Sequence, residues 1–225
     1  MQDGNLQVIK SEIQSSSKGT QSEIVGVRDF PLMEHYYTIQ GEGYNTGTPA
    51  YFIRLGGCDV GCVWCDVKDS WDAMKYPLTS IDEMIELVKK ANASTVVITG
   101  GEPLMNDLTV LTKYFHENNI RLWLETSGTY PLSGEWNWIC VSPKKFKAPL
   151  KTVLEKADEL KVVIFNRPDF DWAEQHAAMI TDECKLFLQP EFSRQHQMLP
   201  EIIEYIKQNP RWRISLQTHK YMNVP

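Results

Sequence analysis

The sequence predicts an α/β protein built as an open, partial β/α barrel of about six β/α units. Two observations carry this prediction: short apolar, β-branched runs alternate with amphipathic helical segments, and polar residues follow nearly every run. Such alternation is typical of a parallel sheet with helices packed outside it. Six or seven strands are too few to close an eight-stranded barrel, so an open barrel competes with a doubly wound sheet.

The individual elements follow from local patterns. Runs of branched and aromatic residues predict strands at residues 50–55, 95–99, 120–126, 136–142, 159–165, 184–190 and 211–219. Amphipathic segments predict helices over residues 80–92, 106–119, 150–157, 170–180 and 198–209. The first helix is the best marked, because Ser80 is a good N-cap residue and Ile81, Met84, Ile85 and Val88 fall on one face.

The polar clusters decide between the two architectures. They follow the carboxyl ends of five strands, as TGGEP at 99–103, ETSGT at 125–129, SPKK at 142–145, QPE at 189–191 and QTHK at 217–220. Ligand sites in parallel α/β proteins lie at that edge of the sheet. Functional residues at nearly every strand end favour a barrel-like wrap over a single crevice.

Composition and charge exclude several classes of protein. With a net charge of -6 over 225 residues, the chain lacks the basic excess of proteins that bind long nucleic acids. No apolar run approaches the roughly 20 residues of a membrane span, and the first twenty residues lack a signal peptide's apolar core. We therefore expect a cytoplasmic protein without membrane contact. Residues 1–30 are predicted to be a polar extension and residues 31–225 a single domain.

Three of the five cysteines, Cys58, Cys62 and Cys65, fall within eight residues, in a glycine-rich loop after the first predicted strand. An odd number of cysteines makes a poor disulfide framework. A structural zinc site usually has four protein ligands, and no fourth lies nearby in the sequence. An iron–sulfur cubane held by three thiolates keeps one iron open for a substrate or cofactor. Cys140 and Cys184 lie in apolar strands and are expected to be buried small hydrophobic residues.

The spacing C-x3-C-x2-C at this position resembles the cluster motif of the radical S-adenosylmethionine (SAM) superfamily. The resemblance implies a partial barrel of that type, a [4Fe-4S] cluster on the three cysteines, and SAM bound to the open iron. The TGGEP segment is similar to the superfamily's GGE motif, which meets the SAM ammonium, and Trp64 is expected to pack near the adenine. The SAM contacts implied are Trp64, Gly100, Gly101, Glu102, Ser127, Ser142, Pro143, Lys144 and Gln189.

A longer ordered set of motifs narrows the resemblance. YTIQGEG at 37–43, GTPAYFIRLGGC at 47–58, TGGEP, SPK, QPE and QTHKYMNVP at 217–225 together resemble the 7-carboxy-7-deazaguanine synthase family of the queuosine (7-deazapurine) pathway. The resemblance implies a carbon–nitrogen lyase that contracts the ring of 6-carboxy-5,6,7,8-tetrahydropterin with loss of ammonia. Arg54 would bind the substrate carboxylate through paired hydrogen bonds. The substrate contacts implied are Ile39, Gln40, Gly41, Glu42, Arg54, Thr99, His219 and Pro225.

One position departs from the family pattern. Members commonly carry Thr or Ser directly after the Cys-Asp pair, where the hydroxyl ligates Mg²⁺, whereas this chain has Val67. A valine side chain offers no oxygen, so Mg²⁺ is expected to be absent or held by substrate, water and the nearby Asp66, Asp69 or Ser70. Mg²⁺ normally retains several waters, and loss of one hydroxyl need not abolish its binding.

Two other functions use part of the same pattern. A radical SAM activase, which generates a glycyl radical on a partner protein, shares the cysteine spacing but has no use for the pterin-binding set. A non-enzymatic zinc or iron–sulfur carrier needs neither TGGEP nor SPK. The synthase interpretation also implies an electron donor such as flavodoxin or ferredoxin, a homodimer, and a place in the tRNA modification pathway.

Overall fold

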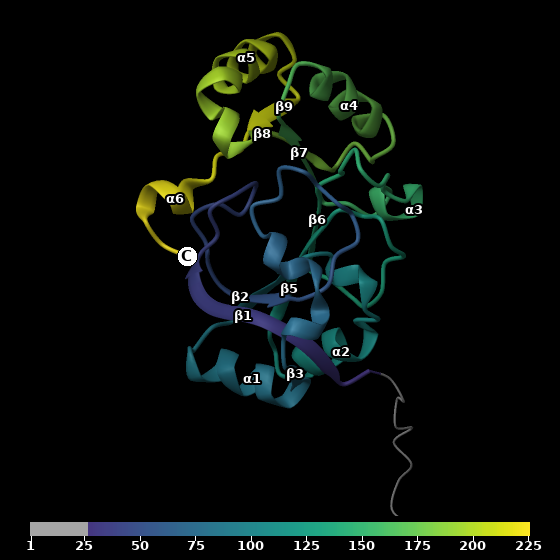
Figure 1. Cartoon of the computed structure of the whole chain (residues 1–225), viewed down its shortest axis with the longest axis vertical. Coiled ribbons are helices and arrows are strands. Elements are labelled where there is room, and N and C mark those ends of the chain that lie inside the picture. The colour runs from purple at the N-terminus through teal and green to yellow at the C-terminus, as the bar shows by residue number, and fades with distance from the viewer. Residues whose placement is uncertain (1–26) are drawn as a thin grey trace, which may run out of the picture.

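The strands of the chain form one open sheet, seen in the computed structural model, which describes residues 27–225. The strands are β1 Asp29–Ile39, β2 Pro49–Leu55, β3 Leu78–Ser80, β4 Thr95–Gly100, β5 Arg121–Thr126, β6 Trp138–Val141, β7 Glu159–Ile164, β8 Lys185–Pro190 and β9 Trp212–Ile214. Their order is β3-β1-β2-β4-β5-β6-β7-β8-β9 (Figure 1). From β2 to β9 all neighbours are parallel, and β1 pairs antiparallel with β2 and β3.

Helices follow most strands and lie outside the curved sheet (Figure 1). They are α1 Ile81–Lys90, α2 Thr109–Glu117, α3 Lys151–Leu154, α4 Pro168–Ala177, α5 Gln195–Gln208 and α6 Thr218–Met222, with short 3-10 helices η1 Lys68–Trp71, η2 Ala73–Lys75, η3 Pro103–Met105 and η4 Phe192–Arg194. At the start of α1, Ser80 Oγ accepts a hydrogen bond from Glu83 N–H, and the Glu83 carboxylate accepts one from Ser80 N–H. This reciprocal pair confirms the predicted cap.

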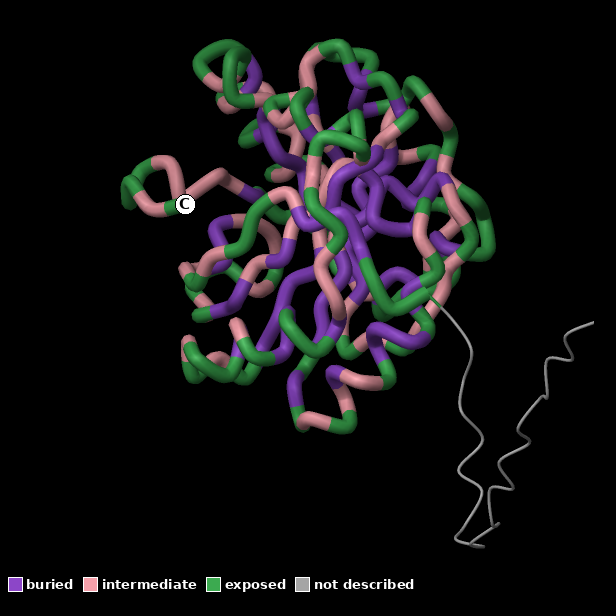
Figure 2. Tube along the Cα trace, turned by 60° about the horizontal axis from the view of Figure 1, so that its bottom comes forward, coloured by how far each residue is buried: buried purple, intermediate pink, exposed green. Residues whose placement is uncertain are grey.

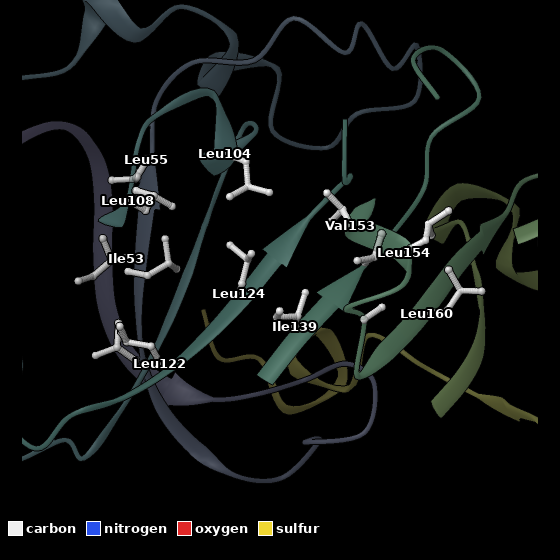
Figure 3. Close-up of a cluster of buried hydrophobic side chains, with 14 of the residues drawn as sticks. Ile53, Leu55, Leu104, Leu108, Leu122, Leu124, Ile139, Val153, Leu154 and Leu160 are labelled. Carbon is white, nitrogen blue, oxygen red and sulfur yellow. The ribbon is translucent and has the colours of Figure 1, made fainter. Parts of the chain in front are cut away.

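The main core lies between the sheet and the helices. Apolar side chains from alternate strand positions, such as Leu122, Leu124 and Leu160, point toward it (Figure 3) and are fully buried. Figure 2 shows the buried stretches at the centre of the molecule and the exposed ones at its edge. The opposite face of the strands holds a smaller apolar cluster that includes Val97 and Trp123. Because strand side chains alternate between faces, the polar residues beyond this cluster also point into the barrel interior.

The predicted open α/β barrel is confirmed, with three local differences. The strand predicted at 211–219 ends at Ile214, because the chain then turns and begins α6, whose Thr218 N–H donates to Gly41 O. The sequence also did not predict β1 and β3, which lengthen one edge of the sheet. β1 begins at Asp29, and Phe30 is completely buried although it was expected in the extension. The rest of that predicted extension, residues 1–26, lies outside the described residues.

Candidate active site

A cavity of about 310 Å³ lies at the carboxyl end of the parallel strands. Its wall combines the loop with the three thiols, the loops that follow the strands, the turn after β1 and the C-terminal segment. Most of the residues predicted from the sequence meet here. They are Ile39, Gln40, Gly41, Glu42, Arg54, Cys58, Cys62, Trp64, Cys65, Asp66, Val67, Thr99, Gly100, Gly101, Ser127, Ser142, Lys144, Gln189, His219 and Pro225; Glu102 and Pro143 are not among its lining residues.

The three thiols face the cavity from one segment, residues 58–65, which we call the thiol loop. Cys58 N–H donates to Trp71 O (3.1 Å) and Cys65 N–H to Cys62 O (3.1 Å), so backbone bonds shape this loop. Cys62 is buried, whereas Cys58 and Cys65 are half-buried. Within residues 27–225 no three Cys, His, Asp or Glu side chains already stand at metal-site spacing. The three thiols therefore line the same wall of the cavity, but their side chains do not converge on one point.

The Gly-Gly pair after β4 packs against the thiol loop. A Cβ on Gly101 would lie 2.6 Å from the Cβ of Cys58, and a Cβ on Gly100 would lie 2.3 Å from the carbonyl oxygen of Leu55. No side chain fits at such distances, so only glycine permits this approach. The pair thereby sets the separation between the end of β4 and the thiols.

Glu102 lies behind the cavity wall and stabilises it through hydrogen bonds. Its side chain is 1 % exposed, and one carboxylate oxygen accepts from Leu104 N–H (3.0 Å) and Thr126 Oγ1 (2.6 Å). The other oxygen accepts from the backbone N–H of Ser127 (2.7 Å) and from its hydroxyl. These bonds tie the GGE turn to the loop after β5, so Glu102 positions Ser127, which does line the cavity.

A half-buried cation, Lys144, lies between the thiol loop and the loop after β6. Lys144 Nζ donates to Ser142 Oγ (2.6 Å) and lies 5.5 Å from the centre of the Trp64 ring. Burial lowers the pKa of Lys144 from its ordinary value. Trp64 also packs edge-on against Phe146. This corner therefore offers an aromatic face, a hydroxyl and an amino group to one ligand.

The C-terminal segment holds the turn after β1 against the cavity. Gly41 O accepts from both the N–H and the hydroxyl of Thr218 (2.9 Å each). A Cβ on Gly41 would lie 2.3 Å from His219 Nδ1, so this contact requires glycine. Thr38 Oγ1 donates to the terminal carbonyl oxygen of Pro225 (3.2 Å), and Figure 1 shows the C-terminus beside the end of β1. Burial lowers the pKa of His219, while the nearby carboxylate of Glu42 raises it; the net shift is downward.

Arg54 and Thr99 occupy adjacent positions on β2 and β4. The guanidinium of Arg54 enters the cavity from the rim, with Nε bonded to the carboxylate of Glu34 (2.6 Å). Gln189, on the opposite side of the sheet opening, accepts a hydrogen bond from Ser215 Oγ (2.7 Å). Ser215 in turn accepts from Gly43 N–H (2.9 Å), which joins the β8 end to the turn after β1.

The sequence analysis assigned no role to two charged residues of this wall, Lys161 on β7 and Glu125 on β5, although Glu125 is the first residue of the ETSGT cluster. Lys161 Nζ lies 2.7 Å from Glu42 Oε2 and 3.0 Å from Glu125 Oε2. Burial raises the pKa of Glu42, but the charge and hydrogen bond of Lys161 outweigh it and lower the value to about 2. The available signal was a lysine within the otherwise apolar strand ELKVVI, since a charge in a doubly covered strand must have buried partners.

The expected Mg²⁺ position offers few oxygens. Asp66, Val67 and Ser70 line the cavity. The Ser70 hydroxyl already donates to Val67 O (2.6 Å). Asp69, the remaining candidate, is exposed on η1 and is not a lining residue. Asp66 is thus the carboxylate best placed to contribute oxygen ligands here.

A second buried carboxylate, Glu159, lies at the start of β7, two residues before Lys161. Its hydrogen bonds stabilise the same wall. One of its oxygens, Oε2, accepts from Tyr44 N–H (3.1 Å) and Trp138 Nε1–H (3.1 Å). The other, Oε1, has no hydrogen-bond partner among residues 27–225. Burial raises the pKa of Glu159 to about 7, against the opposing effect of Lys161.

Comparisons with known proteins agree with this geometry. The model of the radical SAM superfamily matches residues 52–165. A 7-carboxy-7-deazaguanine synthase of Flavobacterium psychrophilum is 55 % identical over 195 residues, which cover 87 % of this chain and 92 % of the relative. A protein of the same name from Synechocystis is 46 % identical over 208 residues, which cover 92 % and 99 % of the two chains.

A solved structure is similar as well. The crystal structure of QueE from Escherichia coli matches with a TM-score of 0.76 at 33 % identity, covering 84 % of this chain and 93 % of the other. These relatives carry the name of a synthase, and nothing in the comparisons favours an activase. Among residues 27–225, no helix is both long and apolar enough to span a bilayer.

Proposed function

Because the chain belongs to the 7-carboxy-7-deazaguanine synthase family of the radical SAM superfamily, we propose that it converts 6-carboxy-5,6,7,8-tetrahydropterin to 7-carboxy-7-deazaguanine, with loss of ammonia. One observation carries this proposal: a single cavity gathers the three thiols, the strand-end loops and the Gln40, Glu42 and Arg54 set. An iron–sulfur carrier has no need for such a wall.

The residues present fit a [4Fe-4S] cluster and SAM. Three thiols on one loop face the cavity, and thiolates are the usual ligands of such clusters. When bound together, the cluster and SAM supply one-electron cleavage of the sulfonium. The chain would hold SAM with Trp64, Ser142 and Lys144 on one side and with Gly100, Gly101, Ser127 and Gln189 on the other. The contact expected from Glu102 is indirect, since its carboxylate is occupied by Ser127 and its neighbours.

On the substrate side, the pterin needs both hydrogen-bond acceptors and a cation. Gln40 and Glu42 face the cavity from the turn after β1, and Arg54 faces it from β2. The guanidinium suits the planar substrate carboxylate, and the Glu42 carboxylate suits N–H groups on the pterin ring. Ile39, Gly41, Thr99, His219 and Pro225 complete the proposed enclosure. Packing of α6 on Gly41 helps to exclude water from it.

The metal ion, the protein partners and the cellular setting of the enzyme complete the proposed function. Mg²⁺, where it binds, is held by Asp66, substrate oxygens and water, because Val67 supplies no side-chain oxygen. The enzyme works in the cytoplasm as a homodimer, receives electrons from a flavodoxin or ferredoxin, and provides a precursor for queuosine in tRNA. The single domain begins with β1 at Asp29, two residues before the start predicted from the sequence, because Phe30 is buried in its core.

Anaerobic turnover tests the proposal. The reconstituted enzyme is incubated with SAM, a reductant and the carboxypterin, and the products are separated by chromatography. We expect 7-carboxy-7-deazaguanine and ammonia in equal amounts, and neither product from Cys62→Ala prepared in parallel. SAM cleavage without any deazaguanine product would show that the cavity serves another substrate.

A further inference from the structure

A lysine buried at the centre of the cavity wall joins two carboxylates from distant parts of the chain. Only 4 % of the Lys161 side chain is exposed, and it lies on the inner face of β7, whereas Leu160 and Val162 belong to the main core. Its Nζ donates to Glu42 Oε2 (2.7 Å), from the turn after β1, and to Glu125 Oε2 (3.0 Å), from β5. One cation thus fixes two anions on the cavity surface.

Each carboxylate has its second oxygen bonded to a side-chain amide. Gln217 Nε2 donates to Glu42 Oε1 (2.8 Å), and Gln40 Nε2 donates to Glu125 Oε1 (3.3 Å). All five residues line the cavity. The arrangement is a chain of Gln217, Glu42, Lys161, Glu125 and Gln40, which we call the amide–carboxylate chain. Carboxylate oxygens have spare lone pairs beyond these bonds, so the chain can still accept hydrogen bonds from a ligand.

Stability alone does not explain this arrangement. Moving charges out of water is costly, and apolar side chains of similar volume are often as stable in the same place. The interior of this barrel already uses apolar residues lower down, at Val97 and Trp123. A net charge of about -1 on the triad, facing a cavity, is therefore better explained by what it binds.

We propose that Lys161 is a positioning residue, which holds Glu42 and Glu125 as a pair of ionised acceptors for adjacent N–H donors of the ligand. The ligand class is a planar ring with an amino-substituted, N–H-bearing edge, and this deepens the function proposed above, on which it rests. Without the cation, the two half-buried carboxylates repel each other, so one of them takes up a proton more readily and is lost as an acceptor. Lys161 is distinct from Arg54, which faces the cavity from the rim.

The electrostatic surroundings support a fixed cation. Burial lowers the pKa of Lys161, but the acidic groups around it raise the value well above its ordinary range. The titratable groups that face the triad come from every neighbouring element: Cys140 on β6, Glu159 on β7, Lys144 after β6 and His219 on α6. Two of these groups bear on the pH range near neutrality: burial raises the pKa of Glu159 to about 7, and burial lowers the pKa of His219 from its ordinary value.

The test replaces the cation and follows ligand binding against pH. Lys161→Met keeps the stem and removes the charge, and Lys185→Met, at an exposed lysine of β8, is the matched control. Dissociation constants for the carboxypterin and for SAM are measured by anaerobic equilibrium dialysis between pH 5.5 and 8.5, with the reconstituted holoenzymes. We expect Lys161→Met to bind the pterin at least tenfold more weakly at pH 7, and more weakly still at lower pH, with unchanged SAM affinity.

Other outcomes overturn the proposal. Native pterin affinity in Lys161→Met, or a loss that does not change with pH, means that the cation does not set the acceptors. Should Lys161→Met fail to fold, Lys161→Met/Glu125→Gln restores the net charge of the triad, and we expect it to fold and to bind the pterin weakly without the added pH dependence. Native affinity in this double variant also overturns the proposal. If the native enzyme itself does not bind the pterin, the proposed function fails instead.

Discussion

Arg54 Nε donates to Glu34 Oε1 across 2.6 Å at the rim of the cavity. The Arg54 side chain is 17 % exposed and that of Glu34 43 % exposed, so the pair lies on the border between solvent and site. Within the described residues 27–225, the two terminal nitrogens of Arg54 make only long contacts, to Gly100 O (3.4 Å) and Tyr36 Oη (3.5 Å). One edge of the guanidinium is thus anchored, and the other remains available for a planar anion.

This geometry predicts the effect of Arg54→Lys. An ammonium keeps the charge but cannot form two parallel hydrogen bonds, so we expect KM for the carboxypterin to rise by about 10- to 100-fold. SAM cleavage without substrate should stay close to native. Steady-state kinetics and the uncoupled formation of 5′-deoxyadenosine measure the two effects.

Glu34→Gln serves as the control for the anchor. It leaves the charge of Arg54 in place and loosens an exposed ion pair, which contributes about 1 kcal/mol or less. The expected change in KM is accordingly about fivefold or less. A variant Arg54→Lys that loses SAM binding and keeps native pterin affinity would assign the residue to the other ligand.

The cysteines give a second prediction. Alanine at Cys58, Cys62 or Cys65 should abolish the brown chromophore of the reconstituted enzyme and its SAM cleavage, because each removes one of three ligands. Cys140→Ala and Cys184→Ala should keep both, since these thiols are buried in β6 and beside β8, and burial raises the pKa of each. Iron and sulfide analysis, together with the visible spectrum, measures the cluster content of each variant. Full cluster content in Cys62→Ala would refute the ligand assignment.

A third prediction concerns Glu159 and pH. Its pKa is about 7 in the folded chain and near 4.5 when unfolded, because burial favours the neutral form. The folded state therefore binds the proton more tightly, and stability falls as pH rises through the window from 4.5 to 7. The shift corresponds to about 3 kcal/mol. Glu159→Gln carries no charge and should not lose this stability.

Urea unfolding at pH 5, 6, 7 and 8 measures the difference. Relative to Glu159→Gln, the native protein should lose about 3 kcal/mol between pH 5 and 8. Glu174→Gln is a matched control, because the pKa of Glu174 is lowered despite its partial burial. A constant difference between native protein and Glu159→Gln across this range would mean that Glu159 is not neutral at low pH in the fold.

The parts of the fold that could be predicted from sequence are those with strong local patterns. The helix after Ser80 and the strand at 95–99 carry their own periodicity and caps, and both are confirmed. Strand β1 has no such pattern: it contains Pro31, and Tyr37 is 49 % exposed. Its place depends on pairing with β2 and β3, which is tertiary information.

The site shows the same division. Motifs such as QGEG and SPK predict site residues in loops, and in the structure these loops line one cavity. Lys161 stands in a strand, and its partners Glu42 and Glu125 are 119 and 36 residues away. No local pattern links such residues. Glu102 illustrates the opposite case, because its motif was recognised but its bonds to Thr126 and Ser127 place it behind the wall.

The last prediction concerns Val67 and Mg²⁺. Mg²⁺ demands near-octahedral oxygen geometry, and a methyl group in place of a hydroxyl forces another donor into that position. Val67 lines the cavity, and the nearby Ser70 hydroxyl is already bonded to the Val67 carbonyl oxygen. We therefore expect the native enzyme to depend only weakly on Mg²⁺. Val67→Thr, close to valine in shape, should increase the activation by Mg²⁺ several-fold.

Turnover across a Mg²⁺ titration, starting from EDTA-treated enzyme, measures this response in both proteins. Asp66→Asn is the informative companion variant, because Asp66 is the carboxylate beside Val67 in the cavity wall. If Asp66 shares the ion with substrate and water, Asp66→Asn should remove the residual response of the native enzyme, and Val67→Thr should restore part of it in the double variant. Strong, saturable activation of the native enzyme that is unchanged in Val67→Thr would place the ion elsewhere, because a new hydroxyl ligand at the right position cannot leave the affinity for Mg²⁺ unaltered.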